Sequence, residues 1–576
     1  MAKKESKKRQ QAALQFALVL AALILVNVLA NSRLGGRSMY AAWDLTEDQR
    51  FSLTDNTKEQ LDSLDEVVYI QVLMEGEFPA TYERLKQAVR AMLEDFRSRS
   101  SYIEYEFINP TAGPVEVVRE RQQQLARDGI VPVTLVQQTA NERETKAIYP
   151  YLIFNYANRT ETVNLLQSNA PGKPADLIVN ESISRLEYYY SSTLERLLDA
   201  NRPLIAFSEG QGELSQLKTA DLEARLRLQY DVGRLSLDSV VAIPQDIKLL
   251  IVAKPTQAYD QRDLFKLDQY IMNGGKVLWA LDGVAMDLDS LQNRNEYYPN
   301  PYELGLDELF FRYGFRINND LVLDMNNTQI PIAVSRTASG PQIEKFDFPY
   351  HVVAVPDPNS DHPVIKNVDP IDLRFPSSID IEIETPDPIE KTLILQSSSR
   401  ARYQRLPAAI DLDVQKYSLD IERFNRDSLL MGVLLEGVFH SPYANRLSSS
   451  FEQTLQNIGQ EFQAQSPPNR MIVVSDGDLL ANTLDREGRP RPLGFNRYQG
   501  YQFANKDLAL NMIEYLLDPE GVVGARGKEV KLRLLDRVGA QTSAAAWRLL
   551  NIGLPLVFLL LFGLAYNFIR RRRFTH

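Results

Sequence analysis

The sequence contains no cysteine and only four histidines in 576 residues. Without cysteine the chain has no disulfide, no thiolate metal site and no cysteine nucleophile, and it is compatible with an oxidising compartment. The closest pair of histidines, His351 and His362, is eleven residues apart. The HExxH spacing that places two zinc ligands on one helical face is therefore missing, and we expect no metal site.

Other catalytic signatures are also missing. No G-x-S-x-G nucleophile elbow occurs in the sequence. Each Gly-Lys pair is followed by Pro, Val or Glu, whereas a Walker A motif needs Ser or Thr; the pairs begin at Gly172, Gly275 and Gly527. We therefore expect a chain that is not an enzyme, that does not hydrolyse ATP by this route, and that carries no cofactor.

Positive charge is scarce outside the two ends of the chain. The formal net charge is −11, yet the first ten residues contain five Lys or Arg, and residues 570–573 are four arginines. The body between these ends is thus strongly acidic. Phosphate attraction needs a basic face, so the composition disfavours a general binder of nucleic acid or anionic membranes.

Long apolar runs are present beside both basic ends. Residues 12–30 are 19 positions without a charge and would span about 28 Å as a helix. Residues 549–569 form a second such run, with Trp547 and Tyr566 near its ends. The first run also resembles a cleaved signal peptide, but its length favours a retained anchor. We expect one transmembrane helix at each end of the chain.

The basic clusters lie outside both runs, so the positive-inside rule places both termini in the cytoplasm. Residues 31–548 then lie across the membrane, which for a bacterial inner membrane means the periplasm. Two helices are too few to line a transport path. Alanines at four-residue spacing in the first run suggest a helix contact with a partner, and the alternative is that alanine is simply a common helix former. Three consecutive tyrosines suggest a contact with a partner protein, and the alternative is a contact between domains of this chain. These residues are Ala13, Ala17, Ala21, Tyr188, Tyr189 and Tyr190.

Apolar strands alternating with helices predict an α/β fold with a mostly parallel sheet. A small α/β domain comes first, and a β-rich insertion rich in Pro and Asp interrupts the parallel-sheet domain. The predicted segments are a basic tail (1–11), a transmembrane helix (12–30), a periplasmic α/β domain (44–170), a connecting helix (176–199), the first part of the parallel-sheet domain (203–320), the insertion (321–465), the closing part (470–518), a juxtamembrane segment (519–548), a transmembrane helix (549–569) and a basic tail (570–576).

The stretch LIAFSEGQGELS, residues 204–215, reads as a strand that enters a glycine loop and opens a helix. Gly210 and Gly212 give the spacing G-x-G, but Ser215 stands where a dinucleotide fingerprint has its third glycine. Glu209 and Glu213 would repel a pyrophosphate at the helix N-terminus. A tight structural turn is favoured over nucleotide binding, and a bound cation is the remaining alternative.

Further carboxylates are expected at the carboxyl ends of strands, where an open α/β sheet binds its ligands. Asp282 follows the strand expected at 276–281, and Asp476 and Asp478 follow the one at 470–476. Asp and Gly are also the usual residues of turns and helix caps, and a role as cap and turn residues is favoured over a ligand site. The candidate ligand-binding residues are Glu209, Gln211, Glu213, Asp282, Asp476 and Asp478.

Several stretches together resemble the gliding-motility-associated ABC transporter accessory proteins, the GldG family. They are RFSLTDNTKEQLDSLDEVVYIQV, IAFSEGQGE, LDQYIMNGGKVLWALD, HPVIKNVDPIDLRFPSSIDI, RMIVVSDGDLLAN and NKDLALNMIEYLL, together with the terminal anchor and its arginine tail. The resemblance implies a flavodoxin-like middle domain, similar to class I glutamine amidotransferases. The nucleophilic cysteine of those enzymes has no counterpart here, and Gln211 stands where related loops often have histidine.

The resemblance implies a non-catalytic, membrane-anchored accessory subunit of an ABC transporter linked to gliding motility. Its expected partners are a multi-span permease and a separate cytoplasmic ATPase, with possible periplasmic or envelope partners, and no nucleic acid. Two alternatives stay open. One is a periplasmic module that binds a glycan or peptide; the other is a periplasmic hydrolase that uses Glu209, Asp476 and Asp478.

Overall fold

A computed structural model describes residues 53–518 and 543–574 with internal gaps, and seven positions before residue 53. The longest gaps cover residues 167–173, 413–420 and 519–542. The chain divides into two compact units, Met1–Glu529 and Val530–His576, which are considered separately. In the first unit, β1 (Arg33–Leu34) pairs with β2 (Arg37–Ser38) ahead of two larger sheets.

The first of these sheets has the strand order β4-β3-β7-β8. Strands β3 and β4 are parallel and are joined through helix α3, so they form a β-α-β unit. Strands β7 and β8 add antiparallel pairs. The elements are α2 (Asp55–Asp62), β3 (Val68–Val72), α3 (Ala80–Arg99), β4 (Ile103–Phe107), α4 (Val115–Arg127), the hairpin β5 (Val133–Gln138) and β6 (Arg143–Ile148), β7 (Tyr151–Tyr156) and β8 (Arg159–Asn164). The sequence did not predict α4.

The helix expected at 176–199 is two helices, α5 (Ala175–Ser184) and α6 (Leu186–Leu198). Arg185 leaves the helical conformation between them. Helix α6 buries most of its circumference. Its Tyr190 ring stands edge-on to the rings of Phe96 and Phe154, with centroids 5.3 and 5.5 Å away, so the tyrosine is a core residue of this domain.

The second sheet has seven strands in the order β10-β9-β11-β12-β24-β23-β20. The first five are mutually parallel, whereas β23 and β20 are antiparallel to their neighbours. Alternate residues of β11 enter different cores: Leu249 and Ile251 pack towards α7 and α12, and Leu250 and Val252 towards α8. The elements are β9 (Leu204–Glu209), α7 (Gln216–Leu226), β10 (Asp231–Ser236), β11 (Ile247–Ala253), α8 (Gln261–Met272), β12 (Lys276–Ala280), β20 (Glu390–Gln396), β23 (Leu430–Gly437), β24 (Asn469–Val474) and α12 (Asn505–Leu517). The chain is thus a mixed α/β protein with a parallel-sheet core.

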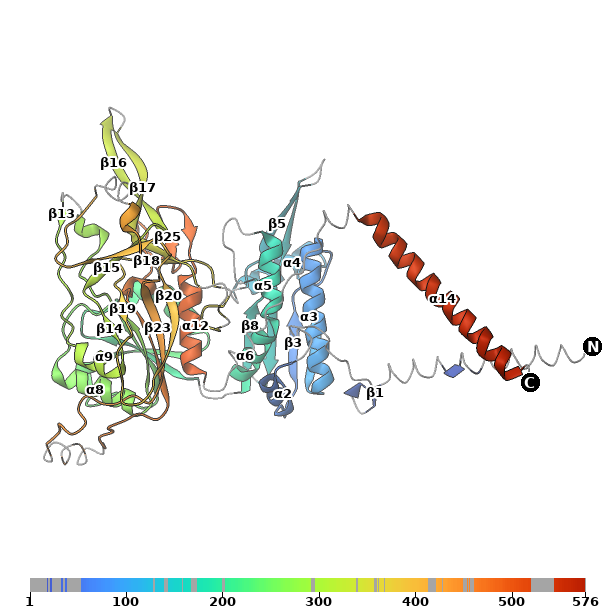
Figure 1. Cartoon of the computed structure of the whole chain (residues 1–576), viewed down its shortest axis with the longest axis horizontal. Helices are drawn as coiled ribbons and strands as arrows, with labels where there is room; N and C mark the ends of the chain where they lie inside the picture. Colours follow the sequence, from blue (N-terminus) through green and yellow to red (C-terminus); the bar gives the residue numbers. More distant parts are fainter. Residues whose placement is uncertain are drawn as a thin grey trace, which may run out of the picture. The chain divides into compact units, whose positions relative to one another are not determined.

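The range expected to form a β-rich insertion contributes two strands, β20 and β23, to this central sheet. The same range also contains the two-residue strand β19 (Ile379–Asp380). The hairpin of β16 and β17 projects from the body of the domain (Figure 1). The other elements are η1 (Leu237–Ser239), η2 (Leu288–Leu291), β13 (Glu296–Tyr297), α9 (Asp307–Tyr313), β14 (Arg316–Ile317), β15 (Asp320–Asp324), β16 (Asn327–Thr337), β17 (Gly340–Ala354), β18 (Ile371–Arg374), β21 (Ala401–Arg405), β22 (Ile410–Asp411), η3 (Ile421–Arg423), η4 (Gly477–Leu480), β25 (Phe495–Asn496) and β26 (Tyr501–Gln502).

The second unit contains the helix α14 (Ala544–Phe574). Within it Leu549–Ile569 has a mean hydropathy of 2.2, and none of this stretch is buried. It is the one helix in the described residues that is long and apolar enough to cross a membrane. The span expected at 12–30 lies almost wholly outside the described residues.

Candidate functional site

The carboxyl ends of three neighbouring parallel strands bring one lysine and three aspartates together. Strands β11, β12 and β24 are adjacent, so the residues that follow them share one edge of the sheet. Lys254 directly follows β11, Asp282 follows β12, and Asp476 and Asp478 follow β24. The edge is therefore the place where an α/β sheet would bind a ligand.

Lys254 bridges two of the three carboxylates. Its Nζ atom lies 2.9 Å from Asp282 Oδ2 and 2.6 Å from Asp478 Oδ2. The lysine is mostly buried, Asp282 is buried, and Asp478 is partly buried. A charged group in such surroundings is tolerated only when it is paired, so each member of this trio supports the others.

Asp476 is fully buried and is satisfied by the backbone. It caps the short helix η4, because its Oδ1 accepts from the Asp478 amide at 2.8 Å. Its Oδ2 accepts from the amide of Arg374 at 2.6 Å. The amide of Gly477 donates to Asp282 Oδ1 at 2.6 Å. The interpretation of Asp476 as a helix cap agrees with this geometry.

Burial and the opposite charges act in different directions on the pKa values of this cluster. Burial opposes the charged form of Lys254, but Asp478 and Asp282 raise its pKa well above the ordinary value. Burial raises the pKa of Asp282 and of Asp476. Burial also acts against ionisation of Asp478, yet Lys254 and Arg374 outweigh it and lower the pKa of this carboxyl. The bridge between Lys254 and Asp478 is thus an ion pair at neutral pH.

Gly477 allows the strand ends to approach each other. A Cβ atom at this position would lie 2.4 Å from Lys254 Cβ and 2.8 Å from its Cα. Lys254 itself has a positive φ of 53°, a left-handed conformation that is uncommon outside glycine. The backbone of Lys254 is therefore held against η4, and only glycine fits opposite it.

The loop after β9 forms a second group of polar contacts. Gly210 and Gly212 have φ values of 120° and 75°, which the turn requires. The backbone oxygen of Gln211 accepts from the amides of Thr256 and Gln257, both at 2.9 Å. The buried Gln211 Nε2 donates to Asp263 Oδ2 at 3.0 Å, and Glu213 Oε2 accepts from the Gln211 amide at 2.7 Å. The loop side chains are thus used to hold the loop.

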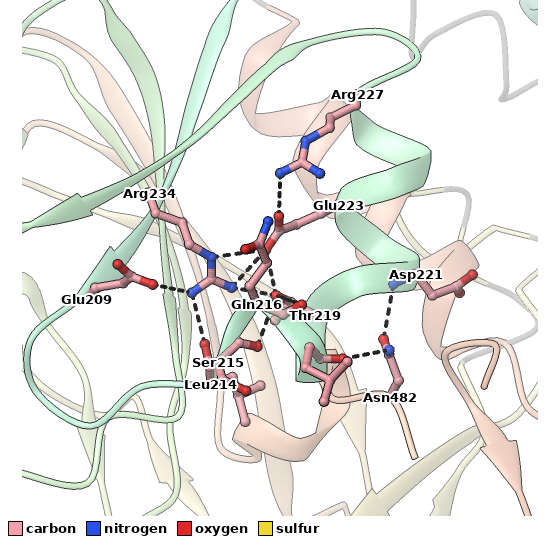
Figure 2. A network of polar contacts seen from close by, with 11 residues as sticks. Glu209, Leu214, Ser215, Gln216, Thr219, Asp221, Glu223, Arg227, Arg234 and Asn482 are labelled. Atoms are coloured by element: carbon pink, nitrogen blue, oxygen red, sulfur yellow. Dashed lines mark hydrogen bonds and ion pairs between the residues drawn. The ribbon is translucent and has the colours of Figure 1, made fainter. Parts of the chain in front are cut away.

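Arg234 on β10 ties the two ends of this loop to helix α7 (Figure 2). Its Nη1 donates to Glu209 Oε1 at 2.8 Å and to the Leu214 carbonyl at 3.1 Å. Its Nη2 donates to Thr219 Oγ1 at 2.6 Å and Glu223 Oε1 at 2.7 Å, and its Nε also reaches Glu223 Oε1, at 3.1 Å. All five guanidinium donors are therefore satisfied within the protein.

The structure thus divides the six predicted site residues into two groups. Asp282, Asp476 and Asp478 form one, and the loop residues Glu209, Gln211 and Glu213 form the other. Sequence reasoning missed the cations beside these groups: Lys254 pairs with Asp282 and Asp478, Arg234 pairs with Glu209, and Arg374 lowers the pKa of Asp478. The position of Lys254 at the end of an apolar strand was the available signal.

The remaining predicted residues have different outcomes. Tyr188, Tyr189 and Tyr190 are all buried by the chain itself, and the Tyr188 hydroxyl donates to Glu514 on α12. Ala13 and Ala17 lie outside the described residues, and Ala21 is described only as an exposed helical position. Within the described ranges, no group of three or more His, Asp or Glu residues is arranged to hold a metal ion.

Comparisons with known proteins agree with a transport-related chain. Residues 202–512 match a family described as an ABC-type uncharacterized transport system, and residues 47–155 match a domain of unknown function (DUF7088). An uncharacterized protein of Borreliella burgdorferi is 20% identical over 546 residues, which are 92% of this chain and 93% of the relative. A solved chain described as the mmIFT52 N-terminal domain is 13% identical with a TM-score of 0.30, and covers 54% of this chain and 96% of its own. That TM-score is too low to support a comparison of folds.

Proposed function

The chain belongs to the family described as an ABC-type uncharacterized transport system, and from this premise we propose that it is a non-catalytic accessory subunit of an ABC transporter. The observation that carries the non-catalytic part is the internal pairing of the strand-end charges. Lys254 pairs with Asp282 and Asp478, and Arg234 pairs with Glu209. General acid–base or metal chemistry needs carboxylates that are free to meet a substrate or an ion, and these already have protein partners.

The apolar helix Leu549–Ile569 supports attachment to a membrane. In the proposed arrangement a second helix at 12–30 anchors the other end, both basic tails lie in the cytoplasm, and residues 31–548 lie in the periplasm of a bacterial cell. The basic residues after the apolar helix favour this orientation. The parallel-sheet domain with helices on both faces is compatible with the flavodoxin-like fold that the resemblance implies.

The proposed partners are a multi-span permease and a separate cytoplasmic ATPase, in a system associated with gliding motility. A chain with two anchors cannot itself form a transport path, so it must act on a pore that another subunit supplies. The anchors would pack on the permease, and the folded body would transmit permease movements to periplasmic cargo or envelope partners.

Co-purification from solubilised membranes tests this proposal. The tagged full chain is extracted in mild detergent, and the proteins that remain bound are identified by mass spectrometry. We expect a multi-span permease and its ATPase in stoichiometric amounts. A variant that lacks residues 543–576 serves as the matched control and should recover less of both. Good recovery of the folded full chain with neither subunit would contradict the proposal.

A further inference from the structure

A cavity beside the Arg234 network has a charged lining that is mainly basic; its lining residue Arg227 shares the partner Glu223 with Arg234. Its volume is about 690 Å³, which is within the range of sites that hold small molecules. One wall consists of residues from β7, β8 and α6, and the other of residues from α7, the turn after it, and α12. The cavity therefore lies between the two sheet-containing parts of the first unit, where ligand sites are common.

The charge of this lining is opposite to that of the whole chain. Five arginines and two lysines line the cavity, against two glutamates and one aspartate, although the chain has a formal net charge of −11. Three tyrosines, Tyr151, Tyr188 and Tyr189, also line the cavity. A concave surface with this charge attracts anions and concentrates them.

Not all of these cations are available to a ligand. Arg227 Nη2 lies 2.7 Å from Glu223 Oε2, and Lys506 Nζ lies 2.9 Å from Asp221 Oδ2; neither carboxylate lines the cavity. These two cations are held by the protein. The available positive charge must come from the other basic residues.

Three arginines are less completely paired. Glu161 is shared, since its carboxylate lies 3.6 Å from Arg196 Nε and 4.0 Å from Arg202 Nη2. The buried Arg196 Nε has no hydrogen-bond partner within the described residues. The side chain of Arg225 makes no hydrogen bond or ion pair in the part of the chain that the structure describes, although its backbone carbonyl accepts from the Leu228 amide. Arg196 and Arg202 stand with one carboxylate between them, and Arg225 comes from the other wall.

We propose that this cavity binds a small organic anion with at least two phosphate or carboxylate groups, held by Arg225 from α7 and by Arg196 and Arg202. Guanidinium groups bind both kinds of oxyanion with paired hydrogen bonds, and two walls of arginine match a ligand that is charged at both ends. The inference does not rest on the proposed transport function, since it follows from the lining of the cavity alone.

Isothermal titration calorimetry on the detergent-solubilised full chain tests the site, with inorganic pyrophosphate and citrate as probes at constant ionic strength. We expect saturable binding of at least one probe at one site per chain. Binding of pyrophosphate alone assigns a phosphate ligand, and binding of citrate alone assigns a carboxylate ligand. Affinity should fall as salt is added, because the attraction is largely electrostatic.

Two variants and one control decide whether the binding occurs in this cavity. Arg225→Gln removes the partner-free cation and should weaken binding about tenfold. Leu228→Glu adds a negative charge at a lining position that is 58% exposed, so it should weaken binding without affecting folding. Arg262→Gln changes an exposed arginine outside the cavity and should leave the affinity unchanged. Equal affinity in all three folded variants, or no saturable binding of either probe, overturns the proposal.

Discussion

At the scale of single residues, the most consequential side chain is Lys254. Its ammonium group is the shared partner of two aspartates at the end of the central sheet. Removing one member of a buried ionic group lowers the free energy of unfolding by more than the intact group adds to it, because the remaining charges stay buried without a partner. Loss of Lys254 therefore leaves two buried carboxylates without their shared cation, whereas loss of either aspartate leaves the lysine with the other one as its partner.

We expect Lys254→Met to lower the free energy of unfolding by about 3 kcal/mol, since Asp282 and Asp478 would lose their shared cation. Urea unfolding at pH 7 followed by circular dichroism measures the change. Lys248→Met, at an exposed position of β11, is the matched control and should change the stability by less than about 0.5 kcal/mol. Equal stability of the two variants would show that the bridge is not structural.

A second residue-scale prediction concerns His351 on β17. Its ring is buried between the rings of Phe348 and Phe375, with centroids 5.2 and 5.3 Å away. Burial, with a smaller contribution from Arg374, lowers the pKa of His351 to about 3. The unfolded histidine titrates near pH 6.5, so it binds a proton at a pH where the folded one does not. Its contribution to stability is complete above about pH 6.5 and is lost as the pH falls towards 3.

His351→Gln should therefore reduce the fall in the free energy of unfolding that accompanies acidification. Between pH 6 and pH 4 the wild-type chain should lose up to about 1.4 kcal/mol per pH unit more than the variant does. Chemical unfolding at a series of pH values gives both curves. Parallel curves over this interval would mean that the neutral, buried state of His351 is wrong.

At the scale of elements, the close contact between η4 and the end of β11 rests on Gly477. Gly477→Ala would place a methyl group 2.4 Å from Lys254 Cβ. Because η4 and the end of β11 would have to move apart, we expect the free energy of unfolding to fall by about 2 kcal/mol. Gly233→Ala, in β10, meets no atom within 4 Å and is the matched control. Thermal unfolding of both variants gives the comparison, and a Gly477→Ala protein as stable as the control would refute the tight packing.

The elements that sequence reasoning predicted well are those with strong local patterns. The strands expected at 276–281 and 470–476 appear as β12 and β24, within two residues of the expected bounds. The misassigned elements depend on distant partners. Nothing within β20 or β23 shows that β23 pairs with β24 and β20 with β23, because register across a sheet is set by side chains far away in the sequence. The break at Arg185 likewise lacks the proline or glycine that would announce it.

The same distinction applies to the candidate site. The aspartates at strand ends could be named from their positions, because strand ends in α/β sheets are recognisable from sequence. Their neutralisation could not, since Lys254 and Asp478 are 224 residues apart in the chain and meet only when β11, β12 and β24 are adjacent. The sequence therefore located the charges but not their pairing.

At the scale of the whole molecule, the absence of cysteine makes the proposed topology directly measurable. A single Ala258→Cys substitution introduces the only thiol, at an exposed position in the loop before α8. In intact spheroplasts we expect a membrane-impermeant maleimide to label it, because residues 31–548 are proposed to lie in the periplasm. A Thr575→Cys chain should be labelled only after lysis. The reverse pattern would place the folded body in the cytoplasm.

The bridge at the sheet edge also has a consequence for where the protein can work. Many proteins hold clustered carboxylates together with a captured divalent ion, and their folding then depends on the supply of that ion. Here the ammonium group of Lys254 occupies that role and is covalently part of the chain. This end of the sheet thus carries a counter-ion for Asp282 and Asp478 that is built into the chain, whereas a divalent ion would have to be supplied by the surrounding medium.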